Sequence, residues 1–211
     1  MRLTTNLLPL LKKSQAPRIL SVLAGGNERQ ILTHDLGLER NYTIINVVNH
    51  TTTMHTLAFE HLAKNNPSVS FIHAYPGWVQ TDILGNLFTP KPGAWYGSIF
   101  ALFRWMAAWG LKVFGISAEE SGERQAFHAT SSRYPSKITI EARVVHAEKV
   151  EASEFAECSV PGNGVYRLSW NGEGVSDNKV LGPYRKEGLP EKIWDHTVEL
   201  FDRALSCRKS I

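Results

Sequence analysis

Histidine and cysteine are the residue types here that most often bind metals or move protons, and their spacing limits both roles. His50 and His55 are five residues apart, so they do not share a helix face as a metal-binding pair four apart would. We interpret both as surface or packing histidines. His73 lies in an apolar segment and is expected to be a hydrogen-bonded core histidine. Neither G-x-S-x-G nor H-E-x-x-H occurs, which argues against a hydrolase or a zinc protease of the common types.

Composition narrows the class of protein further. Cys158 and Cys207 form neither a CxxC motif nor a disulfide framework, so we expect no metal site and a reducing, cytoplasmic compartment. The net charge of +3 comes from basic residues dispersed among acidic ones, which predicts no nucleic-acid partner. A length of 211 residues with 43% hydrophobic residues predicts a single domain over residues 1–211.

Apolar periodicity predicts the elements that must position any site. We expect helices over residues 3–13, 42–64, 117–131 and near 194–205, and strands over 18–24, 68–75 and 164–170. The first strand has the continuous apolar run of a strand buried on both faces of a parallel sheet. Ser117 and Glu120 form a capping-box pattern. Residues 137–163 alternate in places without turn signals, and we assign no element there. This order predicts an α/β fold with a parallel sheet flanked by helices.

The most apolar segment spans residues 93–115 and contains Trp95, Trp105 and Trp109. Two basic residues interrupt it, and a charge near the centre of a membrane-spanning helix is costly, so we expect a buried or interfacial helix. Three roles stay open for the tryptophans: ordinary core, the lining of a pocket for a bulky apolar substrate, or a face lying on a membrane surface.

Residues 18–81 carry a resemblance to a known family. Three successive segments read RILSVLAGG, LAFEHLA and NPSVSFIHAYPGWVQT. They resemble the second half of short-chain dehydrogenases/reductases, in which a strand ends in a catalytic serine, a helix carries Tyr-x-x-x-Lys, and the next strand ends in Pro-Gly-x-Val-x-Thr. Pro76, Gly77, Val79 and Thr81 match the last motif. The later EESGERQAFHATSSRYP and residues 164–170 resemble a divergent fungal group of this superfamily.

The resemblance implies a partial Rossmann-type sheet and an NAD(P)-dependent oxidoreductase that uses NADP or NAD. In the family pattern the Pro-Gly turn approaches the nicotinamide, so Pro76, Gly77, Val79 and Thr81 are the expected cofactor contacts. A carbonyl that accepts a hydride develops negative charge on its oxygen, so the family donates a proton from a tyrosine beside a lysine while a serine holds the oxygen. Tyr42 is the candidate catalytic residue. The alternative for Tyr42 is a hydrophobic anchor at the start of a helix.

The sequence departs from the family pattern at the pyrophosphate site and at the serine. It contains no glycine-rich turn that opens a helix, so the nucleotide-binding βαβ units that begin the family are absent from it. Without them, strand 18–24 is expected to be an exposed apolar edge. Ala24 stands where the family has its catalytic serine.

The tyrosine–lysine pair is the third departure. Asn46 stands four residues after Tyr42, where the family has lysine. If the family pattern is aligned on residues 57–60 instead, Thr43 and Val47 stand at the tyrosine and lysine positions. This alignment is shifted by one residue from the one that uses Tyr42 and Asn46.

Two functions from different classes therefore stay open. The first is an N-terminally truncated oxidoreductase that acts on a bulky apolar carbonyl or alcohol in fungal secondary metabolism, with residues 93–116 covering the substrate. The second is a catalytically inactive remnant that acts through a related partner subunit in a homo- or hetero-oligomer. Ala24 and Asn46 favour the remnant, and the intact Pro-Gly-x-Val-x-Thr motif favours the enzyme.

Overall fold

Two compact units make up the part of the chain that the computed structural model describes, which comprises residues 1–80, 105–106, 109–110, 115–146, 155–176 and 179–208. The first unit contains Met1–Tyr75 and His128–Ile211, and the second contains Pro76–Phe127. The expectation of a single domain over residues 1–211 stays a prediction.

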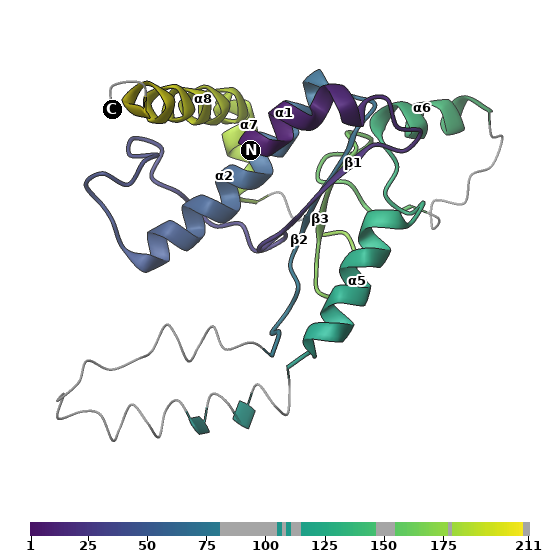
Figure 1. Cartoon of the computed structure of the whole chain (residues 1–211), viewed down its shortest axis with the longest axis horizontal. Helices are drawn as coiled ribbons and strands as arrows, with labels where there is room; N and C mark the ends of the chain where they lie inside the picture. Colours follow the sequence, from purple (N-terminus) through teal and green to yellow (C-terminus); the bar gives the residue numbers. More distant parts are fainter. Residues whose placement is uncertain (81–104, 107–108, 111–114, 147–154, 177–178, 209–211) are drawn as a thin grey trace. The chain divides into compact units, whose positions relative to one another are not determined.

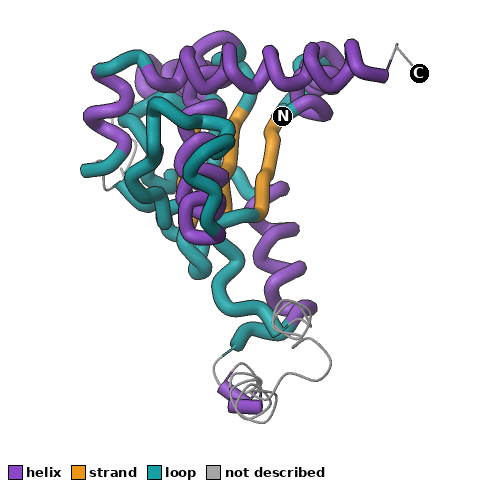
Figure 2. Tube along the Cα trace, turned by 90° about the vertical axis from the view of Figure 1, so that its left-hand side faces the viewer, coloured by secondary structure: helices purple, strands orange, loops and turns teal. Residues whose placement is uncertain are grey.

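The described strands of the first unit form a parallel three-stranded sheet in the order β1-β2-β3. Strands are orange in Figure 2, with purple helices around them. The strands are β1 (Arg18–Val22), β2 (Ser70–Ala74) and β3 (Val165–Leu168). Every residue of β2 is buried, as expected for the central strand. The sheet with its flanking helices confirms the predicted α/β fold and is consistent with a partial Rossmann-type sheet.

Strand β1 lies at one edge of the described sheet, and this corrects part of the prediction. Most of its residues are half-buried and Val22 is exposed, so the expectation of a strand buried on both faces is wrong for the described structure. A continuous apolar run is typical of a strand that is covered on both faces. Among the described residues β1 pairs only with β2 and is covered only in part. The position of β1 at the edge of the described sheet agrees with the expectation of an apolar edge strand.

Four helices, α1 (Arg2–Leu11), α2 (Ile44–Asn65), α7 (Leu181–Lys186) and α8 (Leu189–Arg208), pack together beside the sheet (Figure 1). Leu8, Phe59 and Phe71 belong to one buried cluster that joins α1 and α2 to the sheet. Leu57 and Ile193 belong to a second cluster that joins α2 to α7 and α8. These clusters hold the predicted helices at both ends of the chain in place.

Helix α2 forms despite a sequence of low helix propensity. Its N-cap residue is Thr43, whose hydroxyl accepts a hydrogen bond from the backbone N–H of Asn46 at 3.1 Å. Two threonines inside the helix, Thr53 and Thr56, are buried and form hydrogen bonds to residues outside it. Tertiary packing and these bonds therefore compensate for the weak propensity of the β-branched residues.

The opposite face of the sheet packs against α6 (Lys137–His146) and the segment before it. Ile72 and Tyr166 form a cluster there with Tyr134, and Ile140 packs on it. Residues 137–146, which we left unassigned, are helical. In a strand, Ile138 and Ile140 would point to the same face. Here Ile140 contacts the core whereas Ile138 is 48% exposed, so the alternating apolar residues do not form the buried face of a strand.

The second unit contains most of α5 (Ala118–Thr130). The backbone N–H of Glu120 donates to the Ser117 hydroxyl at 3.0 Å, which confirms the predicted N-cap. The carboxylate of Glu120 instead lies 2.6 Å from Arg124, one turn along the helix. Earlier in the unit, the backbone N–H of Ile116 donates to the carbonyl of Trp78 at 2.8 Å, and Val79 and Ile116 form a parallel bridge.

Most of the apolar segment 93–115, including Trp95, lies outside the described residues. Trp105 and Trp109 fall in short helical stretches and are 66% and 59% exposed. No helix in the described part of the chain is both long and apolar enough to cross a membrane. The substrate-covering role of residues 93–116 stays a prediction.

Candidate functional site

The loop that follows β1 lies at the carboxyl edge of the sheet, where ligands bind in open parallel α/β folds. This loop contains Ala24, Gly25 and Gly26. A Cβ atom on Gly25 would overlap the carbonyl oxygen of His73, so the loop approaches β2 this closely only because residue 25 has no side chain. Gly26 has φ +85°, a conformation that glycine adopts at little cost.

A buried polar network formed by Glu28, Thr56, His73 and Arg167 holds this loop in place. His73 and Arg167 are paired across β2 and β3, so their side chains project from the same face of the sheet. The Thr56 hydroxyl on α2 donates to Oε1 of Glu28 at 2.6 Å and lies 2.8 Å from Nδ1 of His73. Arg167 Nη1 donates to Oε2 of Glu28 at 3.1 Å. The network thus joins the loop, two strands and α2.

The hydrogen bonds of His73 fix its tautomer. Its Nε2 accepts the backbone N–H of Ala24 at 3.2 Å, so the ring proton is on Nδ1 and is donated to Thr56. Burial, together with the nearby charge of Arg167, lowers the pKa of His73 to about 4. The ring is therefore neutral at physiological pH and acts as a fixed support for the loop. The prediction of a hydrogen-bonded core histidine is confirmed.

Within the network, the Glu28–Arg167 ion pair carries the largest desolvation penalty, because both of its charges are removed from water. Both side chains are only 2% exposed, and desolvating two charges is repaid only when their hydrogen bonds are well formed. Glu28 also accepts the backbone N–H of Gly26 at 3.2 Å. The pair therefore fixes the conformation of the loop at the carboxyl edge of the sheet.

Tyr42, the candidate catalytic residue, lies directly before the N-cap of α2 and lines a different cavity. This cavity of about 380 Å³ is formed by the loop before α2, by α2 and by α8. Leu38, Met54 and Ile193 are among its apolar lining residues. Tyr42 is largely exposed to solvent. We call this space the Tyr42 cavity.

Three histidine side chains are among the polar groups that line the Tyr42 cavity. His55 and His196 line it, and within the described structure the buried Nε2 atom of each ring has no hydrogen-bond partner. Burial, and then the proximity of His73, lowers the pKa of His55 to about 3, so this ring is neutral. Unpartnered ring nitrogens in a largely apolar cavity suit an apolar molecule that carries a hydrogen-bonding group. His50, which also lines the cavity, accepts the backbone N–H of Leu32 at 2.9 Å.

Asn46, at the position of the family's lysine, has a structural task. Its side-chain amide donates to the carbonyl oxygen of Asn41 at 2.8 Å, which closes the turn that contains Tyr42. The alternative register of the pair falls on Thr43, the N-cap, and on Val47, which lines the Tyr42 cavity. The catalytic role of Tyr42 stays a prediction.

The predicted cofactor contacts belong to the second unit. Pro76, Gly77 and Val79 lie there, whereas Thr81 is outside the described residues. Gly77 has φ +81°, so the turn needs glycine at this position. Tyr42 lies in the other unit, and the roles of these residues toward a nicotinamide stay predictions.

Sequence reasoning missed Glu28, Thr56, Arg167 and His196. Glu28 and Arg167 are separated by 139 residues, and neither lies in a recognisable motif. No local pattern indicates that they form a pair. Within the described residues, no group of three or more histidine, cysteine or acidic side chains is arranged to hold a metal ion.

Comparison with known proteins places these features in context. No protein-family model and no solved structure matches the chain. The chain is 41% identical to an oxidoreductase of Emericella nidulans over 97% of this chain and 59% of that protein. It is 31% identical to an NmrA-like family domain-containing oxidoreductase of an Aspergillus species over 100% of this chain and 56% of that protein.

A third match is shorter. The human dehydrogenase/reductase SDR family member 12 is 35% identical over 37% of this chain and 26% of that protein. The chain is thus similar along nearly its whole length to fungal proteins named oxidoreductases, and it spans less than two thirds of their length.

Proposed function

We propose that this chain is the C-terminal part of an NAD(P)-dependent oxidoreductase of the short-chain type, acting on a bulky apolar carbonyl or alcohol in fungal secondary metabolism. The observation that carries the proposal is the similarity to fungal oxidoreductases over 97% of the chain. The match to a human dehydrogenase/reductase supports the short-chain type. The parallel sheet is compatible with the Rossmann-type scaffold of that family.

Pro76, Gly77, Val79 and Thr81 would contact the nicotinamide end of NADP or NAD. The positive φ of Gly77 supports this assignment, because a residue without a side chain lets the backbone approach a flat ring closely. The nicotinamide, when bound, supplies or accepts the hydride. The residues that would bind its pyrophosphate have no counterpart in this sequence, in which no glycine-rich turn opens a helix.

Tyr42 would donate the proton to the substrate oxygen as the hydride reaches the carbon. The Tyr42 cavity supports this role because apolar side chains line it and can contact a bulky apolar substrate. His55 and His196 would bind a polar group of the same substrate through their unpartnered Nε2 atoms. Asn46 cannot carry the positive charge of the family's lysine, so proton donation would depend on the residues of this cavity.

Replacing Tyr42 with phenylalanine tests the proton-donor role. In the full-length enzyme, assayed with NADPH or NADH and a panel of bulky ketones, we expect kcat to fall about 10²- to 10⁴-fold with little change in KM, because the phenol acts only in the transition state. Tyr166→Phe is the matched control, since that buried hydroxyl donates to the carbonyl of Pro135. Equal activity of Tyr42→Phe and wild type would remove Tyr42 from the mechanism.

The mass of the protein purified from its native source tests the assignment as part of a longer enzyme. This chain alone has a mass of 23.6 kDa. A larger mass, with preceding sequence that includes a glycine-rich turn, is the expected result. A mass equal to that of this chain would contradict the proposal and favour the alternative.

The alternative is a catalytically inactive remnant that acts through a partner subunit. The open edge of β1 and the exposed apolar residues on α1 and α2, such as Leu3 and Ile44, favour it. A remnant requires a partner but no nucleotide. The protein purified from its native source should therefore bind NADPH or NADH in isothermal titration calorimetry if it is an oxidoreductase, and should bind neither if it is a remnant. Flotation with liposomes tests the remaining possibility that residues 93–115 contact a membrane surface.

A further inference from the structure

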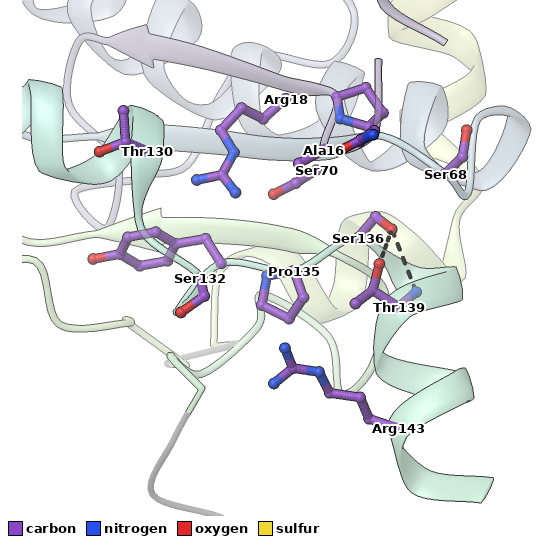
Figure 3. Close-up of a pocket in the computed structure, with 13 residues that line it drawn as sticks. Ala16, Arg18, Ser68, Ser70, Thr130, Ser132, Pro135, Ser136, Thr139 and Arg143 are labelled. Carbon is purple, nitrogen blue, oxygen red and sulfur yellow. Dashed lines mark hydrogen bonds between the residues drawn. The ribbon is translucent and has the colours of Figure 1, made fainter. Parts of the chain in front are cut away.

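A second cavity, of about 250 Å³, lies at the amino ends of strands β1 and β2. Arg18 and Ser70, the first residues of β1 and β2, are paired across the two strands, so their side chains project from the same face. Figure 3 shows Arg18 entering the cavity from β1 and Arg143 entering it from α6. The loop after β1 lies at the other end of these parallel strands. This cavity is therefore separate from the candidate site described above.

Two basic side chains line this cavity. Its described lining residues include Arg18 and Arg143 and no aspartate or glutamate. Arg18 donates through Nη1 to the carbonyl oxygens of Ser131 and His128, at 2.7 and 3.3 Å, and in the described structure it forms no ion pair with a carboxylate. Burial lowers the pKa of Arg18, which indicates a partly desolvated cation. The Arg143 guanidinium lies 5.0 Å from the centre of the Phe155 ring, which orients it.

Hydroxyl groups add hydrogen-bond donors to the same space. Ser70 is 2% exposed, and its Oγ atom has no hydrogen-bond partner among the described residues, although it lines the cavity. A buried hydroxyl without a partner is unfavourable, so its presence here points to a ligand. Ser136 and Thr139, with hydroxyls 3.0 Å apart, lie at the start of α6 and also line the cavity. The first turn of α6 has no acidic residue, so the positive end of the helix dipole is not neutralised there.

We propose that this cavity binds the phosphate group of a small anionic molecule. Arg18 and Arg143 bind it by charge, and the Ser70 hydroxyl donates a hydrogen bond to it. The donors come from two strands and a helix, an arrangement that suits a tetrahedral anion better than a planar carboxylate. A phosphate group has acceptor oxygens on all sides, whereas a carboxylate presents both oxygens in one plane. The proposal does not depend on the oxidoreductase function.

Titration calorimetry and thermal unfolding of the chain with inorganic phosphate, at constant ionic strength, test this proposal. We expect phosphate to bind and to raise Tm. Ser70→Ala should weaken phosphate binding about tenfold, because a hydrogen bond to a charged group is lost. Without phosphate, the same variant should not lower Tm, because the hydroxyl has no partner to lose. A serine with a merely structural role would show the opposite pattern.

Arg143→Gln should also weaken phosphate binding about tenfold. Arg133→Gln is the matched control, since Arg133 is exposed and does not line the cavity. The proposal is overturned if phosphate produces no heat and no rise in Tm, or if Arg143→Gln and Arg133→Gln bind it equally. Equal binding of acetate and phosphate would overturn the assignment to a phosphate group.

Discussion

Replacing Glu28 with glutamine should destabilise the first unit far more than a surface substitution of the same kind. Glutamine is nearly isosteric and keeps an oxygen that can accept the hydrogen bonds from Thr56 and Gly26. The change therefore removes mainly the negative charge that faces Arg167 at 3.1 Å. Because both side chains are only 2% exposed, water cannot replace the lost partner of the guanidinium.

The expected magnitude follows from this burial. Removing one partner of a buried ion pair costs about 3–5 kcal/mol, because the other charge is left uncompensated. A domain of this size is stable by only about 5–15 kcal/mol, so the loss is a large fraction of the total. Urea unfolding followed by far-ultraviolet circular dichroism gives the free energy of unfolding for both proteins.

Glu199→Gln is the matched control. Glu199 lies 3.2 Å from Arg203 on α8, but its side chain is 68% exposed, so we expect a loss below about 0.5 kcal/mol. The double variant Glu28→Gln/Arg167→Met should recover much of the stability, because no buried charge remains. A loss below about 1 kcal/mol for Glu28→Gln, or one equal to that of the control, would refute the reasoning.

Two further predictions concern the same loop and its surroundings. Because the folded-state pKa values of His73 and His55 are about 4 and about 3, well below the ordinary 6.5, the unfolded chain binds protons that the folded chain does not as the pH falls below 6.5. The free energy of unfolding should therefore be fully retained above that pH and should decrease toward about pH 4 by up to ~1.4 kcal/mol per pH unit for each histidine. Urea midpoints that stay constant across this pH range would contradict the lowered pKa values. Gly25→Ala should lower the free energy of unfolding by about 2–3 kcal/mol or more, because its Cβ would overlap a backbone carbonyl. Gly182→Ala is the control and should not lower it, because there is open space around that residue. Similar unfolding curves for the two variants would show that the loop can move away.

The sequence by itself determined most of the secondary structure and the fold class. Apolar periodicity predicted α1, α2, α8 and the three strands of the described sheet, and the side-chain chemistry of Ser117 predicted the start of α5. These signals are local, because period and capping depend on residues within a few positions of one another. The alternation over residues 137–144 failed as a signal, since only contact with the core distinguishes Ile140 from Ile138.

Tertiary structure alone decided which polar residues meet. Glu28 and Arg167 come together because β3 lies beside β2 in the sheet, although 139 residues separate them in the chain. In the same way, α8 brings His196 to the Tyr42 cavity. The half-buried edge of β1 likewise depends on which strands neighbour it, which the composition of the strand does not specify. The physical reason is that periodicity fixes which face of an element is buried, whereas the partner of that face depends on the path of the whole chain.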